Sequence, residues 1–92
     1  MDEQFKLLRQ RYRERAGERL LALDRALAAG DCAAAENIAH KLAGSGASFG
    51  FPQVSQLAEP LELAANAGAD IADLRHLAEP LLAELGRIAQ AV

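Results

Sequence analysis

His40 is the residue of this sequence whose type and setting best suit nucleophilic chemistry. It lies in a segment where Ile38 and Leu42 belong to one apolar stripe of helical spacing. At about 100° per residue, His40 lies about 160° around the helix from each of these two residues. The spacing therefore argues against a buried, structural histidine and leaves a solvated histidine or a nucleophile as the alternatives.

Two glycines after His40 favour the nucleophile. Gly44 follows His40 by one helical turn on the same face, and Gly46 comes two residues later. Inside a helix each glycine costs up to about 1 kcal/mol relative to alanine, and this segment otherwise uses alanine freely. Because Gly44 removes side-chain bulk beside the imidazole, we expect another molecule to approach closely there.

Glu62 is the expected partner of the imidazole. In a helical hairpin that turns near Phe51, His40 stands eleven residues before the turn and Glu62 eleven residues after it, at about the same height. A carboxylate that accepts from Nδ1–H fixes the tautomer and leaves the lone pair of Nε2 pointing outward, as in other activated nucleophiles. The pattern alone equally allows Glu62 to be an ordinary exposed acid.

The other candidate nucleophiles and metal ligands have less support. His76 lies off the apolar stripe of its segment, without a glycine or an obvious acid partner, and we interpret it as a surface residue. Cys32 is the single cysteine and can form no internal disulfide, which favours a reducing compartment. Ser45 and Ser48 lack a base that would activate them. The two histidines and the cysteine lack metal-ligand spacing, so we expect no metal site and no bound cofactor.

The elements that position these residues are predicted to be helices throughout. The 92-residue chain contains 21 alanines and 15 leucines but five β-branched residues, all Val or Ile. Alanine and leucine head the helix scale, whereas strands favour β-branched and aromatic side chains. This length suits one domain and excludes an ATP-dependent catalytic domain. We expect an all-α protein without autonomous kinase activity.

Glycines at positions 17, 30, 50 and 68 divide the chain into segments of helical length. Asp31 and Asp70 are the expected N-caps of the third and last segments. The pentapeptide Leu-Ala-Glu-Pro-Leu occurs twice and places Pro60 and Pro80 inside helices, where we expect continuity with a bend. The predicted helices span residues 2–15, 17–29, 31–48, 52–68 and 70–91.

Short connections between these helices favour antiparallel neighbours. We therefore predict one domain over residues 1–92, an up-down antiparallel four-helix bundle of residues 17–92. Residues 1–16 would add a short N-terminal cap helix.

The charge is unevenly distributed, with a balance of +2 over residues 1–30 and −5 over residues 31–92. Acids interrupt the basic cluster near the N-terminus, and no helix-turn-helix or aromatic stacking pattern accompanies it, so a solvated helix face is expected rather than a nucleic-acid site. The polar N-terminus and the absence of an apolar run near 20 residues predict a cytoplasmic protein without a membrane span. The cluster consists of Arg9, Arg11, Arg13, Arg15 and Arg19.

Residues 40–45, His-Lys-Leu-Ala-Gly-Ser, with Phe49-Gly50 after them, resemble the phosphoacceptor helix of histidine-containing phosphotransfer (Hpt) domains. Leu57, Leu61-Glu62, Ala65 and Gly68 are similar to the helix that follows it in that family. The resemblance implies a four-helix bundle in a two-component phosphorelay. Such a protein exchanges a phosphoryl group between its histidine and the aspartate of response-regulator receiver domains, in a system with a hybrid sensor histidine kinase.

Carried over to this sequence, the resemblance makes His40 the phosphoacceptor, with Glu62 holding Nδ1 and Lys41 screening the phosphate charge. Gly44 would give room to the phosphoryl group and to the partner, which would bring the Mg²⁺ ion. Family members often have a second lysine where this chain has Ala43, so less positive charge is expected beside the phosphate. The expected docking surface around the histidine comprises Ala33, Asn37, Lys41, Gly44 and Ser48.

The missing lysine also keeps an alternative open. An Hpt-like helical adaptor would bind a receiver or a kinase without accepting phosphate.

Overall fold

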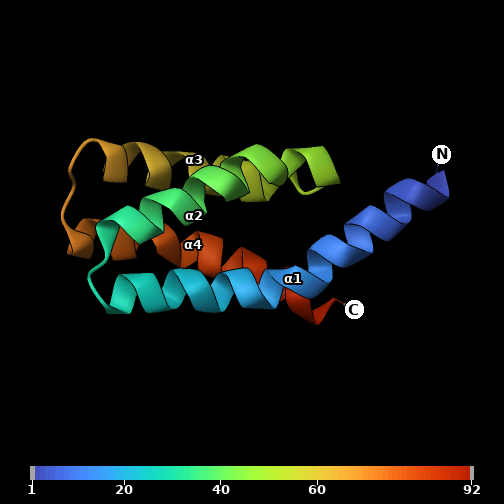
Figure 1. Cartoon of the computed structure of the whole chain (residues 1–92), viewed down its shortest axis with the longest axis horizontal. Coiled ribbons are helices and arrows are strands. Elements are labelled where there is room, and N and C mark those ends of the chain that lie inside the picture. The colour runs from blue at the N-terminus through green and yellow to red at the C-terminus, as the bar shows by residue number, and fades with distance from the viewer. Residues whose placement is uncertain (1, 92) are drawn as a thin grey trace.

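The computed structural model describes residues 2–91, and position 2 by its backbone alone. It contains four α-helices, a short 3₁₀ helix η1 and, over these residues, no strand, so the predicted all-α class is confirmed. The chain reverses its direction at each connection between α-helices (Figure 1). The elements are α1 (Asp2–Ala28), α2 (Cys32–Ser45), η1 (Ala47–Phe49), α3 (Pro52–Asn66) and α4 (Ile71–Gln90).

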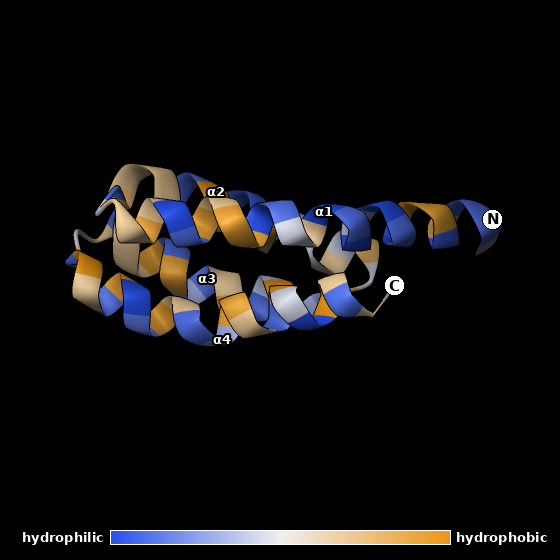
Figure 2. Cartoon of the chain, turned by 90° about the horizontal axis from the view of Figure 1, so that it is seen from below, coloured by the Kyte–Doolittle hydropathy of each residue, from blue (hydrophilic) through white to orange (hydrophobic). Residues whose placement is uncertain are grey.

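Helix α1 corrects the sequence-based division of the N-terminal region. The predicted break between a cap helix of residues 1–16 and a bundle beginning at 17 is wrong, because one helix runs through Gly17. A glycine ends a helix when it takes a left-handed conformation, and Gly17 is not among the glycines with positive φ. Burial of Tyr12, Ala16 and Leu23 on one side of α1 holds the helix together across the glycine. The first turns of α1 extend beyond the other helices (Figures 1 and 2).

The helix ends follow ordinary capping chemistry. Gly30 and Gly68 have φ values of 69° and 86°, the left-handed conformation that glycine adopts without strain after a helix. Asp31 accepts a hydrogen bond from the amide of Ala34 at 3.0 Å, and Asp70 accepts one from the amide of Asp73 at 2.9 Å. Both predicted N-caps are therefore confirmed.

The C-terminal end of α2 differs from the prediction, which continued the helix to residue 48. The helix ends at Ser45, and η1 leads the chain into α3. A Cβ atom on Gly46 would lie 2.8 Å from the amide nitrogen of Ser55 and 2.9 Å from the carbonyl oxygen of Phe51. Because α3 returns this closely, the chain leaves the α-helical path one turn earlier than the hydrophobic pattern suggests.

The core consists mainly of leucine with alanine between the helices. Alanines at positions 16, 35, 39, 58 and 78 are fully buried, which allows the helix backbones to approach closely, and no polar side chain among the described residues is buried. Helix α2 packs against α1 and α3, and α4 packs against α1 and α3. Hydrophilic and hydrophobic residues alternate along the helices (Figure 2). The largest fully buried side chains are Leu23, Leu42, Val54, Leu61, Leu74, Leu81 and Leu85.

The two internal prolines are accommodated on the solvent side of the bundle. Pro60 in α3 and Pro80 in α4 are exposed, and both helices continue through them as predicted. The carbonyls that lose their helical donors belong to Gln56 and His76, which are also exposed and can bond water. A bend at each proline stays a prediction.

Candidate functional site

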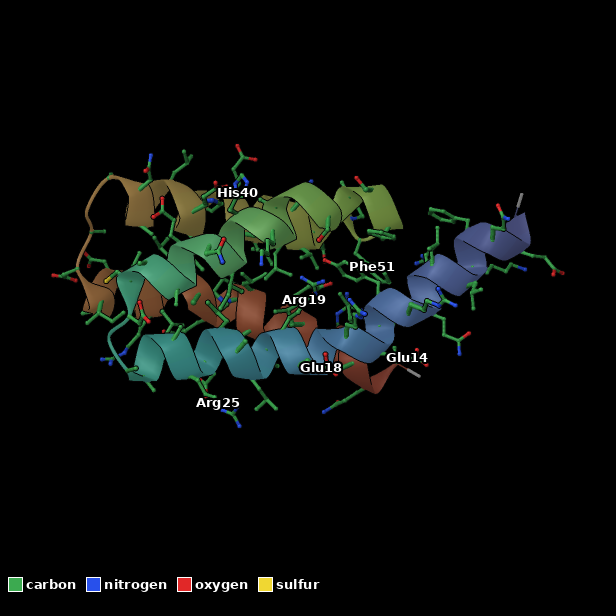
Figure 3. All side chains as sticks on the ribbon, in the orientation of Figure 1. Glu14, Glu18, Arg19, Arg25, His40 and Phe51 are labelled. Carbon is green, nitrogen blue, oxygen red and sulfur yellow. The ribbon has the colours of Figure 1, made fainter. Side chains whose placement is uncertain are left out.

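His40 projects from the exposed face of α2. Its side chain is 71% exposed, whereas the preceding Ala39 and, on the opposite face, Leu42 are fully buried. The outward orientation that the helical spacing predicts is therefore present, and the ring is accessible to another molecule (Figure 3).

Glu62 of α3 reaches the imidazole from the neighbouring helix. Its Oε2 lies 2.5 Å from Nδ1 of His40, and its side chain is 27% exposed. A carboxylate oxygen accepts and does not donate, so Nδ1 carries the hydrogen of this bond. In a neutral ring the lone pair then belongs to Nε2, which is the nucleophilic form of the imidazole.

The two glycines of the motif have different environments. A Cβ on Gly44 would meet no atom within 4 Å, whereas one on Gly46 would collide with the start of α3. Gly46 is thus explained by the turn between α2 and α3. Gly44, exposed on the same face as His40, has no such explanation within the described residues.

The other predicted site residues lie on two sides of His40. Ala33 and Asn37 line a shallow hollow together with Glu36, His40 and Glu62. Lys41 lines a different hollow, on the side of α2 that faces α1.

Ser48 lies in η1 rather than in α2. Its hydroxyl donates to the carbonyl of Gly44 at 3.3 Å, a local backbone contact at the end of the helix. Ser45 likewise makes a structural contact, since its Oγ lies 3.2 Å from the hydroxyl of Tyr12.

An aromatic cluster that the sequence pattern did not indicate joins α1 to the turn between α2 and α3. The ring centroid of Tyr12 lies 5.4 Å from that of Phe49 and 5.2 Å from that of Phe51, with the rings stacked. The guanidinium of Arg9 lies 4.9 Å from the Phe51 centroid, and that of Arg19 lies 5.7 Å from the Tyr12 centroid. The helical spacing of Tyr12 was the available sign in the sequence that this residue packs against the bundle. It could not identify the rings that Tyr12 contacts, because Phe49 and Phe51 are more than 30 residues away in the sequence.

His76 is a surface residue with an acid neighbour. Its side chain is 86% exposed, and Nδ1 lies 3.5 Å from Oε1 of Glu79, one turn later on α4. The expectation that it has no acid partner was wrong. It nevertheless lacks the open glycine that accompanies His40.

Among the described side chains, those of residues 3–91, no group of three or more His, Cys, Asp or Glu is placed to hold a metal ion. The helices of this part of the chain also lack a stretch both long and apolar enough to span a membrane.

Comparison with models of protein families matches residues 7–91 to the model described as the Hpt domain. No curated protein and no solved structure matches the chain significantly. The matched range contains all the site residues described above.

Proposed function

Because the chain belongs to the Hpt domain family, whose model matches residues 7–91, we propose that it carries a phosphoryl group on His40 in a two-component phosphorelay. The family supports a role in histidine phosphotransfer in general. The observation that carries the finer proposal is the hydrogen bond between Nδ1 of the exposed His40 and Glu62. It leaves Nε2 available toward solvent, where a receiver domain can reach it.

The proposed step is a direct transfer from a receiver aspartyl phosphate. The lone pair of Nε2 attacks phosphorus, the Nε2–P bond forms, and the bond from phosphorus to the aspartyl oxygen breaks with its electron pair leaving on the aspartate. The ring gains a positive charge as phosphohistidine forms, and the carboxylate of Glu62 offsets this charge through Nδ1–H. Donation to another receiver follows the same path in reverse.

Positioning and charge stabilisation account for most catalysis of phosphoryl transfer, so a small helical bundle can serve as the carrier. The up-down arrangement of α2 and α3 brings His40 and Glu62 to one height. We propose that Gly44 admits the phosphoryl group and that Lys41 screens its charge. The chain itself binds no cofactor in this proposal. The receiver would supply Mg²⁺, which neutralises charge on the phosphoryl oxygens.

The proposed partners are response-regulator receiver domains and a hybrid sensor histidine kinase, with Ala33, Asn37 and Ser48 at the edge of the docking surface. Such a relay places the chain in the cytoplasm. Neither nucleic acid nor membrane has a role in it.

The test is phosphotransfer from a panel of phosphorylated receiver domains to the wild-type chain and to two matched variants. His40→Gln removes the proposed acceptor, and His76→Gln makes the same change at the other histidine, which is also exposed. We expect acid-labile label on the wild type and on His76→Gln, and none on His40→Gln. Label that persists on His40→Gln would show that another residue accepts the phosphate.

The second candidate function is an Hpt-like adaptor that binds a receiver or kinase without phosphotransfer. It is favoured by Ala43, half-buried at the position where family members often have a second lysine. A stable complex with a receiver, without label on any residue, would select this function over the first.

A further inference from the structure

The surface around His40 has opposite charges on its two sides. Toward α3, the hollow beside the imidazole contains two carboxylates, Glu36 and Glu62. Toward α1, the neighbouring hollow contains three cations, Arg15, Arg19 and Lys41, and one carboxylate, Glu18. The exposed face of α2 therefore lies between an acidic border and a basic border.

The basic border is at the height of the predicted docking surface. Helices α1 and α2 run in opposite directions, and the contact between Tyr12 and Ser45 fixes their relative height. Arg15 consequently lies beside the start of the segment from Lys41 to Ser45, and Arg19 lies one turn further along, where Ile38 and Lys41 line the same hollow. That segment contains the open position of Gly44. In Figure 3, Arg19 lies on the side of α1 that faces α2, whereas Arg25 points away on the far side.

The charges of this border are available for a partner. Among the side chains of residues 3–91, the contacts within 4.0 Å between a carboxylate and a nitrogen of Lys, Arg or His are His40–Glu62, His76–Glu79 and Glu84–Arg87. None of them uses Arg15, Arg19 or Lys41. Arg19 is held in place over the Tyr12 ring, at 5.7 Å from its centroid, while Arg15 is exposed.

We propose that a receiver domain docks over the surface formed by Arg15, Arg19, Lys41 and Gly44, with its acidic active-site rim against the arginines. The proposal rests on the function proposed above and names the side from which the partner approaches. A receiver that holds Mg²⁺ must do so with carboxylates, so its rim is acidic. Arg15 and Arg19 attract such a rim, and Glu36 and Glu62 repel it from the opposite side.

This arrangement also accounts for Ala43. The positive charge that a second lysine of α2 would provide comes instead from α1. The arginines act on encounter and orientation, whereas His40 and Glu62 perform the transfer.

The experiment measures binding of a receiver domain at low salt and at 1 M salt by fluorescence anisotropy and stopped flow. The receiver is the member of the panel that transfers fastest or, if none transfers, the one that binds the wild type most tightly. The variants are Arg15→Gln and the matched control Arg25→Gln, which remove the same charge from exposed positions of one helix. Arg15→Lys restores the charge at the first position.

At low salt, we expect Arg15→Gln to weaken binding by about 3- to 10-fold, mainly through a slower association rate. Arg25→Gln and Arg15→Lys should stay within about 2-fold of the wild type. At 1 M salt the Debye length is about 3 Å, so the difference between Arg15→Gln and Arg25→Gln should disappear.

Equal binding by Arg15→Gln and Arg25→Gln at low salt would overturn the docking proposal. So would a loss of receiver affinity in Arg15→Gln that is the same at both salt concentrations. The docking proposal would also be overturned if the wild type bound none of the receivers in the panel. Binding without label on His40 has a different meaning: the proposed phosphotransfer is then wrong, while the comparison of the two arginine variants still decides where the receiver docks.

Discussion

The contact between His40 and Glu62 joins α2 to α3 through one side-chain hydrogen bond. Hairpin geometry could predict that the two side chains lie at one height, since this depends on the number of residues on each side of the turn. Whether a carboxylate bonds the ring or points into water depends on side-chain rotamers, which no spacing rule contains. The structure decides this in favour of the bond.

We predict that Glu62→Ala slows phosphotransfer to His40 by about 10- to 100-fold, the range expected when a hydrogen bond to a charged group is lost. Glu62→Gln keeps an acceptor for Nδ1–H but removes the charge, so its loss should be smaller. Single-turnover transfer from a phosphorylated receiver measures both rates. Glu59→Ala is the control, because Glu59 is an exposed acid on the same helix. Equal rates for Glu62→Ala and Glu59→Ala would contradict an orienting role.

At the scale of the helices, the capping residues and most helix limits were predictable, whereas the end of α2 and the continuity of α1 through Gly17 were not. Asp31 and Asp70 act through contacts with residues three positions along the chain, so local sequence contains the whole signal. The end of α2 depends on Ser55 and Phe51, which crowd Gly46 from the next helix. The continuity of α1 through Gly17 depends on tertiary packing in the same way. The presence of a glycine in the sequence does not tell whether a helix ends there, as near Gly46, or continues, as at Gly17.

Gly44 and Gly46 permit a direct test of this distinction, because they are two positions apart and differ in their surroundings. Gly44→Ala should raise the free energy of unfolding by up to about 1 kcal/mol, since the methyl group meets open space and alanine favours helix. Gly46→Ala should lower it by about 1–3 kcal/mol, since the backbone of Ser55 must move. Urea unfolding followed by circular dichroism measures both. A stabilising Gly46→Ala would show that the tight turn is not required.

At the scale of the whole molecule, the aromatic cluster connects the long helix α1 to the turn between α2 and α3. Tyr12 is 5% exposed and contacts Phe49, Phe51 and Ser45, whereas Phe5, nearer the N-terminus of α1, is 44% exposed. The composition, with its 21 alanines and 15 leucines, agrees with a core that consists mainly of these two residue types. It could not show that three of the four aromatic residues gather at one end, because that requires the path of the chain in space.

Removal of the Tyr12 ring should therefore affect the stability of the whole bundle. We expect Tyr12→Ala to lower the free energy of unfolding by about 3 kcal/mol or more, as for other large buried aromatic residues. Tyr12→Phe keeps the ring and loses the hydroxyl contact with Ser45, so its cost should be about 1 kcal/mol. Phe5→Ala, a matched removal of an aromatic ring from an exposed position, should cost less than either. Thermal and urea unfolding give the three values, and a Tyr12→Ala variant as stable as Phe5→Ala would mean that α1 is held to the bundle without the cluster.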